Sequence, residues 1–272
     1  MSFFTNSDGL SLHYSDEGEG IPLLCLAGLT RNGRDFDFVA PHLEGMRLIR
    51  LDYRGRGESD WADPESYTPL VESRDVLELL DHLGLEKVAI LGTSRGGLIA
   101  MTLAASAKDR VLGVALNDVG PELNRAALQR IGDYIGRKPA HKSYDALLKV
   151  WPDLAQGFDK VPLSRFREEI VRQYREGDNG LELTYDPALR QGVEAALEAE
   201  MPDLWPLFDA LEGLPLCAIR GANSALLTQE TLAKMKQRRP DMITAEVPDR
   251  GHVPYLDEPA ALEALHAWTA RL

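Results

Sequence analysis

The chain has few of the residues that metal, nucleotide and disulfide-bonded proteins require. Only two cysteines, Cys25 and Cys217, occur among 272 residues, and each lies in an apolar run. Such cysteines are typical of small buried apolar side chains, and we expect no disulfide in a reducing cytoplasm. No cluster of cysteine and histidine has metal-ligand spacing, and neither G-x-G-x-x-G nor a P-loop lysine is present. We therefore expect no metal and no cofactor.

Positive charge is also scarce. Lysine and arginine number 30 against 43 aspartates and glutamates, which gives a net charge of −13 and a pI near 5.0. This balance argues against nucleic acid and anionic membranes as partners. No apolar run approaches the ~18 residues of a membrane span, and residues 1–9 lack the basic and apolar regions of a signal peptide. We expect a cytoplasmic protein that acts on a small molecule, with its oligomeric state left open.

Apolar runs and helical patterns alternate over residues 1–120, and apolar residues make up 44% of the chain, enough for a full core. Expected strands are 2–5, 10–15, 23–27, 48–51, 88–91 and 111–117, then 216–220 and 243–247; expected helices are 36–43, 68–83 and 94–107. Continuous apolar strands suit a parallel sheet covered on both faces. The alternation predicts an α/β fold with a doubly wound, mostly parallel sheet.

Residues 121–205 differ in character, because strand-like runs give way to charged helical patterns broken by prolines. We expect this stretch to be a helical insertion, with residues 1–120 and 206–272 forming the core. Trp151 and Trp205 are weak candidates for lining a substrate pocket. The arginines of residues 165–175 are candidates for holding a substrate carboxylate, although the glutamates between them favour a solvated mixed-charge face.

The most informative stretch is the G-x-S-x-G motif at residues 92–96, with Ser94 at its centre. An apolar run precedes it and a helical run follows, so a strand must turn sharply into a helix. The two glycines leave room for that turn, and the serine is raised on strained backbone away from the sheet. The start of the helix offers the N–H of Arg95 to a developing negative charge. Ser94 is therefore the predicted nucleophile.

A histidine appears where such a nucleophile needs a base. Gly251 and His252 follow the expected strand 243–247 and precede a C-terminal helical pattern. Active sites of open α/β sheets gather at the carboxyl ends of the strands. Serine first and histidine last is also the order found in hydrolases with a G-x-S-x-G turn. His252 is therefore the predicted catalytic base.

With these residues identified, the chain resembles the α/β-hydrolase superfamily, in its esterase-like branch with a helical lid. Residues 26–30 resemble the oxyanion loop, with alanine at 27 where histidine is common, and the resemblance implies that Leu29 supplies a backbone N–H. Residues 52–60 resemble the structural D-x-R-G-x-G-x-S turn, and residues 251–259 resemble the histidine loop. The resemblance implies a lid at residues 121–205 and hydrolysis of carboxylic esters through an acyl-enzyme.

The chain departs from this family at the acid. The family carries an aspartate in a turn such as G-x-x-S-D after the strand expected at 216–220, and this chain has Ala225 there. Loss of the acid from such a triad costs on the order of 10⁴ in rate. One explanation is that Asp118, at the end of the expected strand 111–117, orients His252 instead. The other is that Ala225 marks a disabled triad, and the sequence leaves both open.

Several functions share this set of residues. Ester hydrolysis is the primary hypothesis, with an ester or lactone as the small-molecule substrate. Lactone or enol-lactone hydrolysis and C–C cleavage use the same serine and histidine, and Ala225 also allows a non-catalytic ligand-binding protein. A serine at position 94 disfavours the dehalogenases and epoxide hydrolases of this fold, which use an aspartate nucleophile. The acyl length is not predicted.

Overall fold

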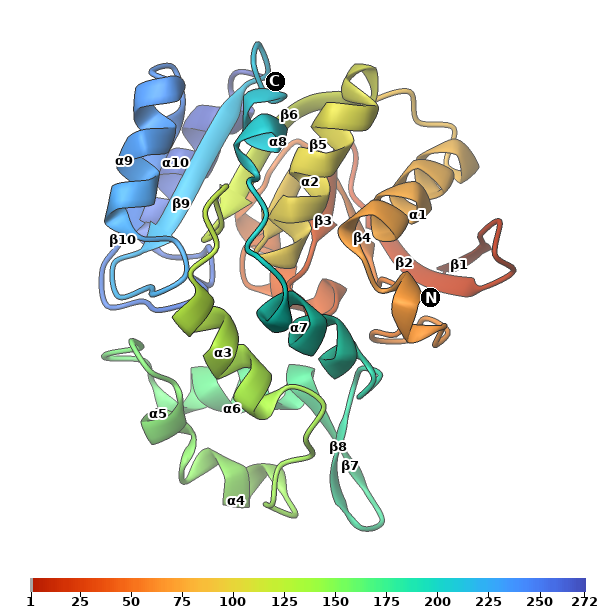
Figure 1. Ribbon diagram of the computed structural model, residues 1–272, viewed down its shortest axis with the longest axis vertical. Coiled ribbons are helices and arrows are strands. Elements are labelled where there is room, and N and C mark those ends of the chain that lie inside the picture. The colour runs from red at the N-terminus through yellow and green to blue at the C-terminus, as the bar shows by residue number, and fades with distance from the viewer. Residues whose placement is uncertain (1) are drawn as a thin grey trace.

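A central sheet of eight strands organises the fold (Figure 1), and the computed structural model describes residues 2–272. The strands are β1 (Ser2–Thr5), β2 (Ser11–Glu17), β3 (Ile21–Leu26), β4 (Met46–Leu51), β5 (Val88–Thr93), β6 (Val111–Asn117), β9 (Leu216–Gly221) and β10 (Ile243–Val247). They lie in the order β1-β2-β4-β3-β5-β6-β9-β10. β2 runs antiparallel to both of its neighbours, and every pair from β4 to β10 is parallel. The predicted α/β fold with a mostly parallel sheet is confirmed.

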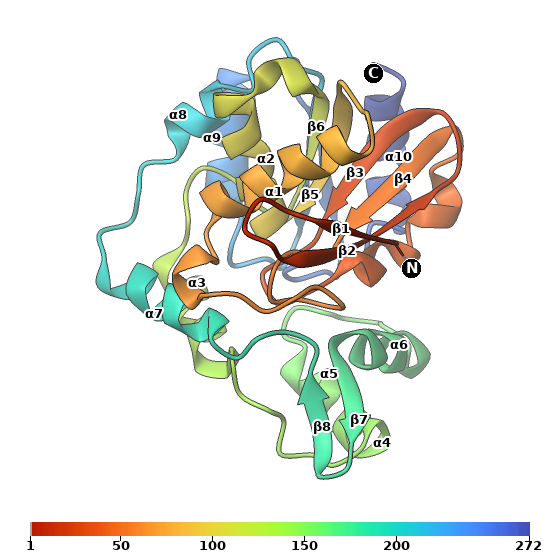
Figure 2. The ribbon, with the colours of Figure 1, turned by 90° about the vertical axis from the view of Figure 1, so that its right-hand side faces the viewer.

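Helices cover both faces of this sheet (Figures 1 and 2). The helices that flank it are α1 (Pro69–His82), α2 (Arg95–Ser106), α8 (Trp205–Asp209), α9 (Gln229–Arg238) and α10 (Pro259–Thr269). Alternate residues of β3 show how the two faces are filled. Leu24 and Leu26 pack with residues of α1 and α2, whereas Leu23 and Cys25 pack on the side of α10. The strands are apolar throughout because each of their faces is buried.

Both cysteines lie in this core and are free. Cys25 and Cys217 are fully buried, and burial raises the pKa of each thiol to about 12. Each therefore acts as a small apolar residue rather than as a nucleophile.

Helix α1 is notable for the carboxylates on its buried face. It begins after Thr68, whose hydroxyl accepts a hydrogen bond from the Val71 N–H, and has Pro69 at its first position. Its buried face includes Val76 and Leu79, as its apolar pattern requires, but also Glu72 and Asp75. A buried carboxylate needs partners, and each of these two pairs with a buried arginine.

Residues 121–205, which we call the inserted segment, lie at one end of the molecule (Figures 1 and 2). The segment contains α3 (Arg125–Tyr134), α4 (Tyr144–Leu148), α5 (Trp151–Leu154), α6 (Leu163–Gln173), β7 (Tyr174–Gly177), β8 (Gly180–Leu183) and α7 (Leu189–Glu198). It contacts the loops after β9 and β10, where Asn223 donates to the Gly157 carbonyl and the Asp159 N–H donates to the Asp249 carbonyl.

Two local expectations were wrong. The inserted segment is not free of strands, because β7 and β8 pair as an antiparallel hairpin. Gly177 and Gly180 bracket its two-residue turn, and Gly180 has a φ of +123° that suits glycine. The helix expected at 36–43 is replaced by two short 3₁₀ helices, Gly33–Asp37 and Ala40–His42. Pro41 explains the break, since it has no N–H to continue an α-helix.

Within residues 2–272, no helix is both long enough and apolar enough to cross a membrane.

The approach of α2 to the sheet yields the first prediction. A Cβ on Gly96 would lie 2.0 Å from the Leu26 carbonyl oxygen, whereas a Cβ on the exposed Gly192 of α7 would meet nothing within 4 Å. We expect Gly96→Ala to lower the free energy of unfolding by about 3 kcal/mol or more, because backbone must move. Gly192→Ala should raise it by roughly 0.5–1 kcal/mol. Urea denaturation measures both, and a well-tolerated Gly96→Ala would contradict the argument.

Candidate active site

Ser94 lies on the sharp turn between β5 and α2. Its φ of 51° and ψ of −111° are unusual for a residue with a side chain. Glycines make the turn possible, because a Cβ on Gly92 would lie 2.6 Å from the carbonyl carbon of Gly96. The Ser94 N–H donates to the Asn117 carbonyl of the neighbouring strand, which fixes the turn to the sheet. The backbone thus raises Ser94 at the carboxyl end of β5.

Three side chains from three strand ends form one chain of hydrogen bonds. His252, in the loop between β10 and α10, has Nε2 at 2.9 Å from the Ser94 Oγ. Its Nδ1 lies 2.6 Å from Oδ2 of Asp118, the residue directly after β6. Asp118 is fully buried, and the His252 side chain is 24% exposed. The expected contact between Asp118 and His252 is therefore present.

Asp118 is held in place by two further donors. Its Oδ1 accepts a hydrogen bond from the Gly221 N–H at 3.0 Å, and its Oδ2 accepts one from the Ser224 hydroxyl at 2.5 Å. Its backbone has a φ of +55°, and its N–H donates to the Ile219 carbonyl. Because its donors lie at the end of β9 and its histidine lies after β10, Asp118 ties three strand ends together.

The position where the resemblance implied an acid has a different environment. Ala225 is exposed, and it is its neighbour Ser224 that turns inward to bond Asp118. The hypothesis that His252 has no carboxylate partner is therefore wrong. The carboxylate comes from the end of β6, and the turn after β9 supplies a hydroxyl that orients it.

The two residues predicted to supply oxyanion N–H groups lie in the segments next to Ser94. Arg95 is the first residue of α2, and Leu29 follows Gly28 in the loop after β3. Over residues 2–272, neither N–H donates to a protein acceptor, as is usual for the first turn of a helix. The Tyr53 hydroxyl donates to the Ala27 carbonyl at 3.0 Å, and this hydrogen bond fixes the loop that contains Leu29. In the part of the chain that the structure describes, both N–H groups are therefore without a protein acceptor, and their role as oxyanion donors stays a prediction.

The side chain of Arg95 does not extend to the mouth of the site. Its Nε donates to Glu72 at 2.7 Å, and its Nη2 donates to the Tyr67 carbonyl at 2.7 Å. The side chain therefore binds to α1 while the N–H of the same residue stays beside Ser94.

Asn117 is a site residue that the sequence analysis missed. It is buried, and its Nδ2 donates to the Pro254 carbonyl at 3.1 Å and to the Thr93 hydroxyl at 3.2 Å. It thereby links the histidine loop to the residue before Ser94. Its place directly before Asp118 is the signal that could have identified it.

Both tryptophans that were candidates for the substrate pocket pack against other aromatic side chains. Trp205 packs edge-to-face on Phe208 and donates from Nε1 to Glu122 at 3.2 Å, contacts that fix α8. Trp151 packs edge-to-face on Tyr174 within a small apolar cluster of the inserted segment. These contacts fix both side chains within the fold, and a role for either in binding substrate stays a prediction.

The arginines of α6 and β7 are engaged with protein carboxylates and are not free for a substrate. Arg165 bonds Asp257 at 2.5 Å, and Arg172 bonds Asp37 at 3.2 Å. Their guanidinium carbons lie 3.8 and 4.2 Å from the ring centroid of Phe38. Arg167 pairs with Asp145, and Arg175 pairs with Glu58. The contacts of Arg165, Arg172 and Arg175 connect the inserted segment to the rest of the chain, whereas the pair of Arg167 and Asp145 lies within the segment.

Polar groups also lie close to the nucleophile. A Cβ on Gly28 would be 3.4 Å from Arg31 Cγ and 3.9 Å from Ser94 Cβ, so only this glycine separates the two side chains. Arg31 reaches Glu169 of α6 at 3.4 Å, and Glu169 accepts a hydrogen bond from the Tyr255 hydroxyl at 3.2 Å. Burial raises the pKa of Tyr255, and the charge of Glu169 raises it further. The surroundings of Ser94 are therefore not purely apolar.

No group of three or more histidine, cysteine, aspartate or glutamate side chains in residues 2–272 is arranged to hold a metal ion.

Comparison with known proteins gives the family. The model of the alpha/beta hydrolase fold matches residues 21–259, so the chain belongs to this family. It is 40% identical over 250 residues to the 3-hydroxybutyrate-oligomer hydrolase of Cupriavidus necator, covering 88% of this chain and 85% of that protein. It is 27% identical over 256 residues to an esterase of Mycobacterium tuberculosis, covering 90% and 81%. A crystal structure of an alpha/beta hydrolase from Novosphingobium aromaticivorans has a TM-score of 0.93 at 36% identity, covering 100% of this chain and 98% of that one.

The resemblance stated from the sequence motifs is thereby confirmed at the level of the family. The relatives are named as hydrolases, and the chain is a hydrolase of this fold.

Proposed function

We propose that this protein is a serine hydrolase that cleaves carboxylic esters of small molecules through an acyl-enzyme. The observation that carries the proposal is the chain of hydrogen bonds from Ser94 through His252 to Asp118, at 2.9 and 2.6 Å. A serine hydroxyl is a weak nucleophile unless a neighbouring base removes its proton. His252 can do so through Nε2 because Asp118 holds the proton on Nδ1.

The reaction follows from these positions. The Ser94 Oγ attacks the ester carbonyl carbon while its proton passes to His252 Nε2. The N–H groups of Leu29 and Arg95 donate to the oxyanion of the tetrahedral intermediate. The C–O bond to the alcohol then breaks, and His252 protonates the leaving oxygen. Water attacks the acyl-enzyme with His252 again as the base, which releases the acid and restores Ser94.

Short hydroxyacyl esters are the substrate class that we favour. Among the relatives, the 3-hydroxybutyrate-oligomer hydrolase of Cupriavidus necator is 40% identical to this chain. The aliphatic stem of Arg31 lies across Gly28 from Ser94, and its guanidinium pairs with Asp35 and Glu169, a polar neighbourhood that suits a short acyl group with a hydroxyl better than a long alkyl chain.

We further propose that the inserted segment acts as a lid over Ser94. Its helix α6 supplies Glu169 to the surroundings of the nucleophile and binds the core through Arg165 and Arg172. A lid at this position selects substrates by the space it leaves and excludes water during the reaction. The contact of Asp118 with His252 weighs against a purely ligand-binding role, because the alanine at position 225 was the feature that favoured it.

The nucleophile can be tested with a matched serine on the same helix. Ser94→Ala should reduce the turnover of p-nitrophenyl acetate and butyrate by about 10⁴-fold or more, because no other group can form the acyl-enzyme. Ser106→Ala, at the exposed far end of α2, should leave turnover within about twofold. Retention of more than about 1% of the rate by Ser94→Ala would refute Ser94 as the nucleophile.

The acid can be tested by changing both candidate positions. Asp118→Asn should lower kcat by about 10⁴-fold, because His252 would lose the partner that fixes its tautomer. Ala225→Asp should bring no gain, since residue 225 is exposed and Asp118 already bonds Nδ1. Steady-state rates on p-nitrophenyl butyrate measure both. A gain of about 10³-fold in Ala225→Asp would instead assign the acid to residue 225.

The substrate class can be tested with esters of different acyl chains. We expect linear dimers and trimers of 3-hydroxybutyrate to be cleaved to monomer, as measured by liquid chromatography. We also expect kcat/KM for p-nitrophenyl butyrate to exceed that for the dodecanoate by about tenfold or more, because the site near Ser94 is polar. Hydrolysis of p-nitrophenyl acetate without cleavage of the oligomers would support the proposed esterase activity and reject hydroxyacyl esters as its substrate class.

A further inference from the structure

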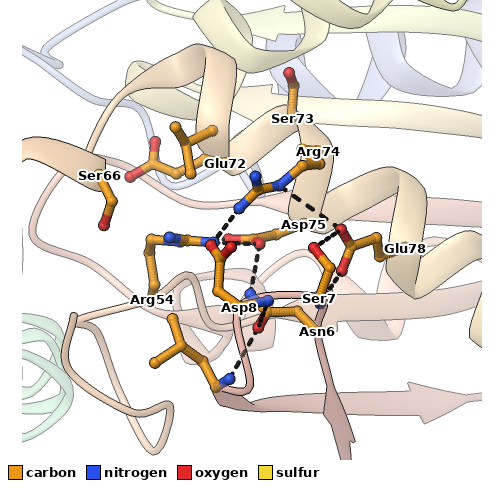
Figure 3. Close-up of polar contacts among 12 residues, drawn as sticks. Asn6, Ser7, Asp8, Arg54, Ser66, Glu72, Ser73, Arg74, Asp75 and Glu78 are labelled. Atoms are coloured by element: carbon orange, nitrogen blue, oxygen red, sulfur yellow. Dashed lines mark hydrogen bonds and ion pairs between the residues drawn. The ribbon is translucent and has the colours of Figure 1, made fainter. Parts of the chain in front are cut away.

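Two buried carboxylates of α1 serve different parts of the molecule (Figure 3). Asp75 pairs with Arg54 at 2.6 Å and accepts a hydrogen bond from Asn6, so it anchors the turn between β1 and β2. Glu72 lies one turn earlier, and its carboxyl group points away from that cluster. It faces Arg56 and Arg95 instead, each at 2.7 Å.

The ion pair between Glu72 and Arg95 involves the residue that carries the first N–H of α2. The Arg95 side chain donates to Glu72 and to the Tyr67 carbonyl, so both ends of its guanidinium are held by α1 and the residues before it. The side chain is 14% exposed, and Glu72 is fully buried. Because one residue carries both the held side chain and the N–H beside Ser94, fixing the first limits the movement of the second.

The ion pair between Glu72 and Arg56 links the carboxylate to Leu29, the residue that carries the other proposed oxyanion N–H. Arg56 is fully buried, and its Nε donates to the Leu29 carbonyl at 2.9 Å. Its Nη1 donates to the Arg54 carbonyl at 2.7 Å and lies 2.7 Å from Glu72. The guanidinium also lies over the ring of Tyr67, at 5.3 Å from its centroid. Glu72 thus lies in an ion pair with Arg56 through charge rather than through an aligned hydrogen bond, and Arg56 donates a hydrogen bond to Leu29.

The charges in this cluster support ionised side chains. Burial by itself raises the pKa of Glu72, but the charges of Arg56 and Arg95 outweigh it, and the pKa is lowered overall. Burial also lowers the pKa of Arg56, and the charge of Glu72 opposes that shift. Buried ion pairs add little stability over apolar residues of the same volume, because their desolvation offsets their attraction. Stability therefore does not account for this buried cluster, and the positions of its charged groups need another explanation.

We propose that Glu72 is a positioning residue for the oxyanion hole. This single buried carboxylate holds, through Arg95 and Arg56, both residues whose N–H groups receive the oxyanion. The inference rests on the proposed ester hydrolysis at Ser94. Since the oxyanion forms only in the transition state and the intermediate, loss of the carboxylate should act on kcat rather than on KM.

The test compares Glu72→Gln with Asp75→Asn, because each removes from α1 a fully buried carboxylate that pairs with a buried arginine of the turn after β4. Glu72→Gln should lower kcat for p-nitrophenyl butyrate by about 10- to 100-fold and leave KM within about twofold. Its affinity for butylboronic acid, whose adduct with Ser94 places an oxygen in the oxyanion hole, should fall in parallel. Inhibition by butyrate should not change, because its carboxyl carbon stays trigonal and does not mimic the tetrahedral intermediate.

Asp75→Asn controls for the loss of a buried ion pair. It should lower the Tm about as much as Glu72→Gln does, yet keep kcat within about twofold when both variants are assayed well below their Tm. A Glu72→Gln variant with unchanged or raised kcat would overturn the proposal. An equal loss of kcat in Asp75→Asn would overturn it as well, because the effect would then be one of stability.

A second variant covers the case in which Glu72→Gln does not fold. Arg95→Met keeps the backbone N–H and leaves Glu72 paired with Arg56, so it tests the contact with α2 alone. We expect kcat to fall about fivefold or more at constant KM, and an unchanged kcat would overturn the proposal. Absence of turnover in the wild-type protein would instead reject the proposed function itself, so the two failures can be told apart.

Discussion

The 2.6 Å hydrogen bond between Asp118 and His252 is the contact on which the arrangement of the site depends. It joins the end of β6 to the loop after β10, and the donors of Gly221 and Ser224 bring in the end of β9. A catalytic histidine needs its ring fixed in one tautomer and direction, and a carboxylate does this from whichever strand end can reach it. A carboxylate at the end of β6 can therefore hold the histidine as one in the turn after β9 would, which is the basis for proposing Asp118 as the acid.

Most of the fold could be predicted because its signals are local. The apolar run at 88–91, the glycines around Ser94 and the helical pattern after it all follow from neighbouring residues. The failures were of two kinds. Pro41 interrupts an apolar pattern that otherwise suits a helix, and hydrophobic periodicity does not register a missing N–H. The hairpin β7–β8 is short and mostly polar, so its sequence has no alternating apolar pattern, and the glycines of its turn are its only local signal.

The contact between Ser94 and His252 could be predicted, because each residue lies in a recognisable motif. The site was not predictable where a residue acts through contacts distant in sequence. Whether Asp118 bonds His252 depends on how β6 and the loop after β10 meet, and the spacing of 134 residues carries no information about that. The same holds for Glu72, which a helical pattern marks only as a polar residue in α1. Its role depends on Arg56 and Arg95, which approach it from two other elements.

The turn after β4 is short, yet it contacts both the loop of Leu29 and the inserted segment. Arg56 binds the Leu29 carbonyl on one side, while the N–H of Gly57 donates to the Thr184 carbonyl of the inserted segment on the other. The N–H of Asp186 donates back to the Gly55 carbonyl. The loop that carries one proposed oxyanion donor and the segment proposed as a lid are therefore anchored on the same few residues. Glycine at 57 permits this, because a Cβ there would lie 2.1 Å from a carboxylate oxygen. The turn after β4 thus fixes the loop whose N–H we propose as an oxyanion donor, and such donors stabilise a transition state only when their positions are fixed.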